Sequence, residues 1–274
     1  MAAFQIPPFA RDSRANRVTN SVVTLLTNSQ SAIRWLYLCG PQEAAVQVEM
    51  AAKNLCVPSS GHSEFMAQHT HCYEFDQGVP DEILDLVEIL KEALSLAKRD
   101  YLDFALALDW YKIPDSAVEP KYWPNTEIGE MIYRGKYWSD GLEKIAARQD
   151  LLQRVASMMD RHPLFRNARC VVTVPGSNAD GNSFGERLAG KVAEITQKEL
   201  IRTECTIGAR PPRKEGGGRT FEDIYKVSQS LTDDVVIIDD VYRSGMTMSA
   251  VALAARRAGA KRVFGFAAVR TMRN

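Results

Sequence analysis

The segment that most constrains this chain lies near its C-terminal end. Residues 235–265 read VVIIDDVYRSGMTMSAVALAARRAGAKRVFG. Four β-branched apolar residues, which favour a buried strand, run directly into Asp239 and Asp240. A short loop follows, and the alanine-rich stretch after it predicts a helix that closes at Gly259. This order of strand, acidic pair, loop and helix is typical of an α/β protein that binds a ligand where a strand ends.

The second half of the chain alternates short apolar runs with amphipathic stretches. The runs predict strands and the stretches predict helices. The expected elements are a helix over 139–162 started by Ser139 or Asp140, a strand with a Pro-Gly turn over 169–178, a helix over 183–201, a strand over 233–240, a helix over 245–259 and a strand over 261–270. The alternation predicts a doubly wound, parallel α/β sheet. The turns at 175–183 and 239–247 are therefore expected to share one rim, beyond the carboxyl ends of the strands.

The first 120 residues are expected to be mostly helical. Residues 18–38 predict a helix followed by a buried segment, and residues 41–54 predict a second helix. The clearest helix covers 80–100, because its apolar residues form one stripe: Ile83, Leu86, Val87, Leu90, Leu94 and Ala97. Residues 113–125 contain three prolines and predict a boundary. The expected division is an N-terminal region over 1–120 and an α/β domain over 125–274.

Composition excludes several classes of protein. No apolar run approaches the roughly 20 residues of a membrane-spanning helix. Residues 1–17 lack the basic-then-apolar order of a secretory signal. The five cysteines are odd in number and irregularly spaced, so they do not suggest a disulfide framework. We therefore expect a cytoplasmic protein with no membrane contact.

The net charge of zero conceals an uneven distribution. Residues 61–110 carry eleven acidic and three basic side chains, whereas residues 161–274 carry nineteen basic and twelve acidic ones. A basic C-terminal region suits an anionic ligand. It equally suits an ordinary solvated surface, and charge alone leaves both interpretations open.

The loop after the acidic pair has the chemistry of a phosphate site. Residues 244–247 read Ser-Gly-Met-Thr, which places backbone amides and two hydroxyls at the start of a helix. Free N–H groups and the positive end of the helix dipole attract a phosphate there. Two adjacent carboxylates repel each other and need cationic or hydroxyl partners. An acidic pair beside a phosphate cradle predicts a ribose 5-phosphate site, and the simpler alternative is a plain strand–turn–helix.

Residues 235–247 resemble the phosphoribosyl pyrophosphate signature of type I phosphoribosyltransferases. That signature has four apolar residues, two acidic ones, three variable ones and Thr-Gly-x-Thr, which reads Ser-Gly-Met-Thr here. The resemblance implies that fold over 125–274 and a glycosyltransferase activity. It implies that Asp239 and Asp240 are catalytic and bind the ribose 2- and 3-hydroxyls, directly or through a Mg²⁺ cofactor. It also implies that five residues surround the 5-phosphate: Arg243, Ser244, Gly245, Met246 and Thr247.

Two further segments carry the resemblance. Residues 171–194 are similar to a strand–loop–helix unit whose loop contacts pyrophosphate, which implies that role for Pro175, Gly176 and Ser177. Residues 203–228 occupy the place of a flexible hood that closes over the sugar. Its basic residues would bring positive charge to the leaving group: Arg210, Arg213, Lys214 and Arg219. A simple turn and a solvated basic loop are the alternatives.

The order VPGSNADGNSFGERLA and the segment MIYRGKYW at 131–138 resemble the ComF-like branch of this family. The stretch NSFGERLA does not keep the branch's arginine and glutamine in register, and the branch's four-cysteine zinc element is missing. Six other side chains are of the metal-binding type: Cys39, Cys56, Cys72, His62, His69 and His71. They contain no CxxC pair, so buried cysteines and surface histidines are the simpler account.

The leading functional expectation is a site for phosphoribosyl pyrophosphate, or a related ribose 5-phosphate ligand, with Mg²⁺. The phosphoribosyl group would pass to a nucleobase, another nitrogen nucleophile or water, and Glu222 and Asp223 are candidate bases by position only. One alternative is a non-catalytic regulator that senses this ligand. Nucleic-acid binding has weak support, because the first 60 residues hold five basic and three acidic side chains.

A second alternative is a nucleotide-targeting effector of a bacterial antiviral defence or toxin system. The N-terminal region, as a hood or a docking region with its acidic stretch 61–110, would then bind a protein partner. An exposed sheet edge would also suit a homodimer.

Overall fold

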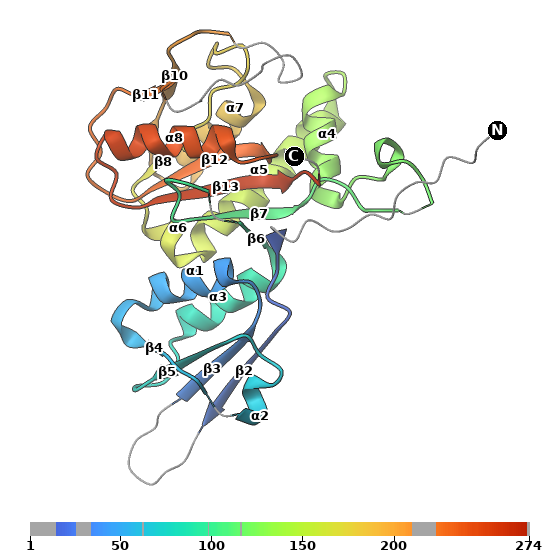
Figure 1. Ribbon diagram of the computed structural model, residues 1–274. Helices are drawn as coiled ribbons and strands as arrows, with labels where there is room; N and C mark the ends of the chain where they lie inside the picture. Colours follow the sequence, from blue (N-terminus) through green and yellow to red (C-terminus); the bar gives the residue numbers. More distant parts are fainter. Residues whose placement is uncertain are drawn as a thin grey trace, which may run out of the picture.

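The computed structural model describes residues 15–25, 34–61, 63–97, 99–115, 117–209 and 223–272. Its centre is a seven-stranded sheet with the order β1-β6-β7-β13-β12-β8-β9 (Figure 1). Five neighbouring strands run parallel: β7 (Phe104–Trp110), β13 (Val263–Arg270), β12 (Val235–Tyr242), β8 (Cys170–Thr173) and β9 (Glu199–Ile201). At one edge β6 (Leu94–Leu96) and β1 (Ala15–Asn16) pair antiparallel.

Helices cover both faces of this sheet. On one face lie α5 (Leu142–Arg161) and α7 (Phe184–Ile195), and on the other lies α8 (Met246–Arg257). The side chains of β12 alternate between the two cores. Val236 and Ile238 pack in the cluster that contains α7, whereas Val235 and Ile237 pack in the cluster that contains α8. A strand buried on both faces is apolar on both faces, and the predicted doubly wound α/β class is confirmed.

The N-terminal region is mixed rather than mostly helical, which corrects the expectation for residues 1–120. A second, antiparallel sheet has the order β2-β3-β5-β4. Its strands are β2 (Asn20–Leu25), β3 (Arg34–Cys39), β5 (His71–Phe75) and β4 (Val57–Pro58). The helix expected within 18–38 is β2 instead, because β-branched Val22, Val23 and Thr24 pair with β3.

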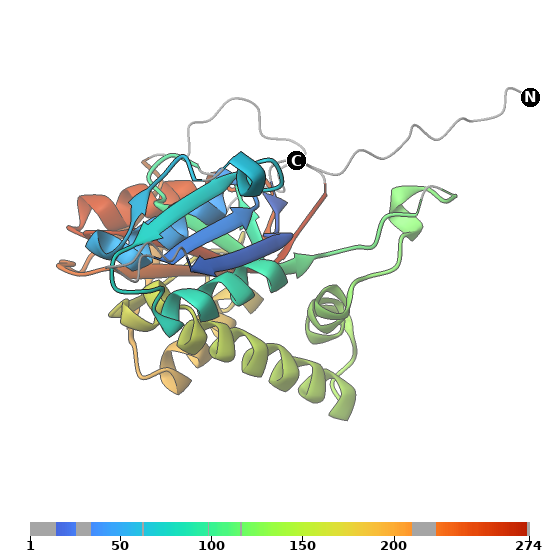
Figure 2. The same cartoon turned by 90° about the horizontal axis from the view of Figure 1, so that it is seen from below.

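Two helices separate the small sheet from the large one. Figure 1 shows α1 (Gln42–Ala52) and α3 (Asp81–Glu92) between them. Figure 2 shows α3 running alongside α5, which it contacts. A short 3₁₀ turn η1 (Lys53–Leu55) follows α1, and α2 (Ser63–Met66) precedes β5.

Two predicted helices end early because their last residues join the central sheet. The helix expected over 80–100 stops at Glu92, and the next apolar residues form β6, which pairs with β7. The helix expected over 183–201 stops at Ile195, and β9 then pairs with β8. The helix expected from Ser139 or Asp140 begins at Leu142 after Gly141, and Asp140 instead accepts a hydrogen bond from Lys144 Nζ at 3.0 Å.

One core joins the two halves of the chain. The strands β1, β6 and β7 come before residue 120, yet they belong to the central sheet. Phe75 of the small sheet and Phe264 of the large one lie in the same hydrophobic cluster. The remaining elements are η2 (Pro120–Tyr122), α4 (Glu127–Tyr137), α6 (Pro163–Asn167) and the hairpin of β10 (Thr203–Cys205) with β11 (Tyr225–Val227). Within the described segments, no helix has the length and apolar character that crossing a membrane requires.

Candidate functional site

The candidate site lies where two neighbouring connections leave the central sheet on opposite faces. After β8 the chain crosses to α7, and after β12 it crosses to α8. Pairing of β12 with β8 ends at Ile238 opposite Thr173, while β12 continues beside β13 as far as Tyr242. Asp239 and Asp240 therefore extend past the end of β8. Ligands of open α/β sheets bind at such a divergence.

Asp239 is half-buried against the first turn of α7. Its Oδ1 accepts a hydrogen bond from the Asp240 backbone N–H at 2.9 Å. Gly185 approaches so closely that a Cβ there would lie 2.9 Å from the same oxygen. Burial, and next the charge of Asp240, raise the pKa of Asp239 well above its usual value. The pair therefore resists carrying two negative charges.

The counterion of the acidic pair is Lys136, from α4. Its Nζ forms an ion pair with Asp240 Oδ2, and the two side chains are only 23% and 10% exposed. Thr126 fixes the start of α4, because its hydroxyl accepts from the Gly129 N–H at 3.0 Å and donates to the Trp110 carbonyl at the end of β7. Residues 131–138 resemble a family element, but no pattern in the sequence shows that this lysine reaches Asp240.

The loop after β12 has the backbone that a helix-start anion site requires. Gly245 is the N-cap of α8 with φ of 73°, a left-handed conformation that favours glycine. A Cβ at Gly245 would lie 2.1 Å from Tyr242 Oη. A glycine N-cap offers no side-chain oxygen to the first N–H groups of the helix. Of the other predicted phosphate contacts, Arg243 and Met246 are exposed, and Ser244 and Thr247 are half-buried.

In the turn after β8, the carboxylate of Glu186 accepts hydrogen bonds from the backbone. Ser183 and Glu186 form a capping box, in which Ser183 Oγ accepts from the Glu186 N–H and Glu186 Oε2 accepts from the Ser183 N–H, each at 3.1 Å. The same Oε2 also accepts from the Gly176 N–H at 3.2 Å. A carboxylate of the protein itself thus lies at one predicted pyrophosphate contact. Of the other two, Pro175 is buried and Ser177 is exposed.

The predicted cationic hood residues Arg210, Arg213, Lys214 and Arg219, together with Glu222, lie outside the described residues. Asp223 is described and exposed. It pairs with Arg257 at 2.8 Å. Arg257 is in the last turn of α8, whereas the first turn of that helix adjoins the acidic pair. The structure therefore does not bring Asp223 to the rim.

Carboxylate oxygens are the ligands that Mg²⁺ prefers, and Asp239 and Asp240 supply them. Among the described residues, no group of three or more His, Cys, Asp or Glu side chains is arranged to hold a metal. Asp239 and Asp240 therefore supply part of the oxygen ligands of a Mg²⁺ ion but not a complete set.

The histidines of the small sheet have backbone partners. His69 Nδ1 lies 2.7 Å from the Phe65 carbonyl oxygen, and His71 Nε2 lies 3.2 Å from that of Gly40. Cys72 is buried, whereas Cys39 and Cys56 are half-buried. His62 lies outside the described residues.

Comparisons with known proteins give low similarity. No protein-family model and no curated protein matches the sequence. Among solved structures, a purine phosphoribosyltransferase from Pyrococcus horikoshii Ot3 shares 16% identity and a TM-score of 0.33 over 47% of this chain and 85% of its own. An orotate phosphoribosyltransferase from Aeropyrum pernix shares 22% identity and a TM-score of 0.29 over 45% of this chain and 56% of its own. An adenine phosphoribosyltransferase shares 14% identity and a TM-score of 0.33 over 47% of this chain and 81% of its own. Similarity at these TM-scores does not by itself define the fold of this chain.

Proposed function

We propose that residues 239–247 bind the ribose 5-phosphate part of phosphoribosyl pyrophosphate, and that the protein transfers or hydrolyses the phosphoribosyl group. The main observation that supports this proposal is the position of the acidic pair. Asp239 and Asp240 lie in β12 just beyond its pairing with β8, at the divergence of two connections, and the glycine-capped start of α8 follows five residues after Asp240. A group that binds hydroxyls and a group that binds an anion are therefore adjacent on one rim.

Each part of the rim suits one part of the ligand. The Asp240 carboxylate accepts hydrogen bonds from ribose hydroxyls, and Lys136 is its counterion. The Asp239 carboxyl lies beside that carboxylate as a second group for the ribose hydroxyls, and burial together with the charge of Asp240 raises its pKa. The first N–H groups of α8, with the hydroxyls of Ser244 and Thr247, face the 5-phosphate.

The same groups suit cleavage at the anomeric carbon. As the bond from this carbon to the diphosphate oxygen breaks, the electron pair leaves with pyrophosphate and positive charge develops on the sugar. The Asp240 carboxylate lies on the side of the ribose hydroxyls and stabilises the positive charge on the sugar. Asp239 and Asp240 would hold a Mg²⁺ ion, which would supply positive charge to the departing pyrophosphate. A nitrogen nucleophile or water forms the new bond from the opposite face and releases its proton to solvent.

Isothermal titration of the full chain with phosphoribosyl pyrophosphate and MgCl₂ tests the proposal. The double variant Asp239→Asn, Asp240→Asn is expected to lose at least about tenfold in affinity, because two charge-assisted hydrogen bonds become weaker. The matched control is Glu88→Gln, which removes a 60% exposed carboxylate on α3 and should bind like the wild type. Wild-type binding that is absent at millimolar ligand, or that the double variant retains, contradicts the proposal.

The Glu186 contact favours a second candidate, a nucleoside monophosphate as ligand. Its carboxylate accepts from the Gly176 N–H and would repel a pyrophosphate placed there. A nucleoside monophosphate has the same ribose 5-phosphate but carries a base where the diphosphate would be. A nucleotide-targeting effector, with a partner on the N-terminal region, would use this second ligand, whereas a non-catalytic regulator would sense phosphoribosyl pyrophosphate.

Glu186→Gln separates the two candidates, because an amide oxygen preserves the cap while the charge is lost. If the ligand is phosphoribosyl pyrophosphate, its affinity should rise several-fold in this variant. If the ligand is a nucleoside monophosphate, AMP should bind the wild type more tightly than phosphoribosyl pyrophosphate does, and its affinity should not change in the variant. Titration calorimetry with both ligands gives the answer.

A further inference from the structure

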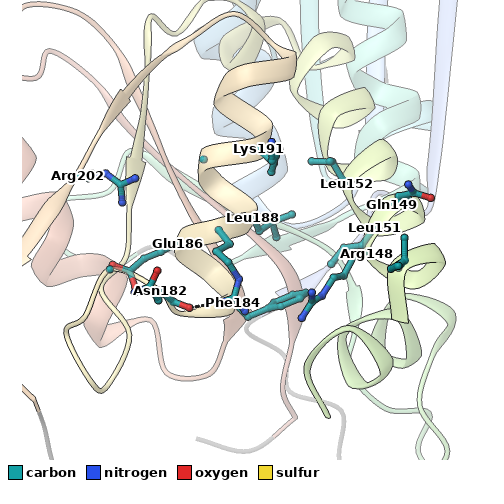
Figure 3. A pocket seen from close by; sticks show the side chains of 14 residues that line it. Arg148, Gln149, Leu151, Leu152, Asn182, Phe184, Glu186, Leu188, Lys191 and Arg202 are labelled. Atoms are coloured by element: carbon teal, nitrogen blue, oxygen red, sulfur yellow. Dashed lines mark hydrogen bonds between the residues drawn. The ribbon is translucent and has the colours of Figure 1, made fainter. Parts of the chain in front are cut away.

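A second pocket lies between α5 and α7, next to the candidate site. Its volume is about 500 Å³, which is within the range of small-molecule sites (Figure 3). Apolar side chains from the two helices form part of its wall. Leu151 and Leu188 are buried, Leu152 and Phe184 are half-buried, and Ile145 is 51% exposed. Apolar surface of this kind is available to the flat body of a ligand.

The charged side chains of this pocket are mostly cationic. Arg148 comes from α5, Arg187 and Lys191 come from α7, and Arg202 comes from the segment between β9 and β10. The single carboxylate of the lining is Glu186, and its Oε2 accepts from two backbone N–H groups in the capping box and the adjacent turn. The pocket therefore has an excess of positive charge that suits an anion.

The cations keep hydrogen-bond donors for a ligand. Arg202 is exposed and makes no hydrogen bond or ion pair with another residue in the described part of the chain. Arg148 uses Nε on the Gly135 carbonyl at 2.9 Å, which leaves the other donors of its guanidinium. Lys191 pairs with Glu194, but these side chains are 63% and 67% exposed. An exposed pair of this kind is weak and exchanges easily.

Phe184 separates this pocket from the acidic pair. Its ring lines the pocket, and Figure 3 shows its side chain next to that of Arg148. The Arg148 guanidinium lies 5.9 Å from the ring centroid, and Lys136 Nζ, the partner of Asp240, lies 5.6 Å from it. The pocket is therefore a separate site from the rim at 239–247, although the two adjoin.

We propose that this pocket binds a small aromatic phosphate, with the ring on the leucines and Phe184 and the phosphate on Arg148, whose side chain lies next to Phe184 (Figure 3). A guanidinium group donates two parallel hydrogen bonds to two oxygens of a phosphate. A single carbonyl oxygen cannot accept both bonds in that geometry. The ring removes apolar surface of the pocket from water. Such a ligand uses both the apolar and the cationic side chains of the lining, and this inference does not depend on the proposed phosphoribosyl chemistry.

Titration calorimetry of the full chain with three probes tests this inference. The probes are 1-naphthyl phosphate, inorganic phosphate and 1-naphthol. The aryl phosphate is expected to bind at least about tenfold more tightly than either of the others, because each of those lacks one half of the recognised structure. Inorganic phosphate or naphthol binding as tightly as the aryl phosphate would overturn the proposal.

Variants locate the bound probe. Arg148→Gln and Leu152→Gln should each lower the affinity for 1-naphthyl phosphate about fivefold or more, since a charge-assisted bond or apolar contact is lost. Arg166→Gln, an exposed arginine of α6 paired with Glu82, is the matched control and should bind like the wild type. Asp239→Asn with Asp240→Asn should leave this affinity unchanged. Full binding in both pocket variants, or loss of binding in the aspartate variant, would place the probe elsewhere and overturn the inference.

Discussion

Asp239, Asp240 and Lys136 are three of the side chains that set the electrostatics of the rim. Burial and the neighbouring charge raise the pKa of Asp239, while Lys136 pairs with Asp240. A carboxyl with a raised pKa contributes stability at low pH that is lost as pH rises through its folded-state value. At neutral pH the acidic pair therefore lowers the stability of the fold, a common property of binding sites. Lys136 offsets part of this effect.

Lys136→Gln should destabilise the protein. Removing this cation leaves the mostly buried carboxylate of Asp240 without its counterion, so the free energy of unfolding should fall by about 1–3 kcal/mol in urea denaturation. Adding Asp240→Asn should recover most of that loss. Lys144→Gln is the control, since its partner Asp140 is 95% exposed, and it should cost about 0.5 kcal/mol or less. A double variant as unstable as the single one would show that the pair does not exist in solution.

At the scale of elements, α7 serves both sites. Its first turn packs on the acidic pair through Gly185, and Phe184 lines the second pocket. The capping box of Ser183 and Glu186 fixes where this helix begins. Such a cap is typically worth about 1 kcal/mol. The position of α7 thus depends on local capping as well as on the packing of Leu188, Ala189 and Val192.

Two glycines of α7 should respond oppositely to alanine. A Cβ at Gly190 would come no closer than 3.7 Å to Leu200, so Gly190→Ala should raise the free energy of unfolding by about 0.5–1 kcal/mol through helix propensity. A Cβ at Gly185 would lie 2.9 Å from Asp239 Oδ1, so Gly185→Ala should lower the free energy and weaken ligand binding. Urea denaturation of both variants measures this. The same sign of change in both would mean that Gly185 does not approach Asp239 as described.

At the scale of the whole molecule, a buried polar network joins the N-terminal region to the central sheet. His162 Nε2 donates to Gln47 Oε1 at 3.1 Å, and Gln47 Nε2 donates to Ser95 Oγ of β6 at 3.2 Å. The imidazole stacks on Phe165 and Phe104, with ring centroids 4.3 and 5.4 Å away. Burial lowers the pKa of His162 to about 3. The ring is therefore neutral in the folded protein at neutral pH.

This network predicts a pH dependence of stability. The unfolded state takes up a proton at His162 below about pH 6.5, whereas the folded state does so only near pH 3. Stability is therefore present above pH 6.5 and falls with decreasing pH, by up to about 1.4 kcal/mol per pH unit from this group. His162→Gln should be less stable at pH 7 but should show a shallower fall between pH 6.5 and 4, as measured by urea denaturation. Equal slopes would show that His162 is accessible to protons in the folded state.

Several elements were predictable because their causes lie within a few residues. The apolar run before Asp239 indicates β12, the alanine-rich stretch with Gly259 indicates α8, and the apolar stripe from Ile83 to Leu90 indicates α3. The strands β6 and β9 were missed because each has only three residues attached to the end of a helical pattern. Their pairing partners, β7 and β8, lie elsewhere in the chain. Short strands of this kind are set by such pairing more than by propensity.

Some features of the candidate site could be predicted from the sequence, and others arise only when the chain folds. The acidic pair, the glycine at the helix start and their order along the chain are local chemistry, and the amino-acid pattern alone was sufficient to identify them. The ion pair of Lys136 with Asp240 joins residues from α4 and β12, and the pocket between α5 and α7 gathers side chains from 145 to 202. Periodicity and propensity describe neighbours within one element, so they carry no information on which distant side chains meet. Only folding brings Lys136 to Asp240 as its counterion. Only folding gathers the cationic side chains that give the second pocket its positive charge.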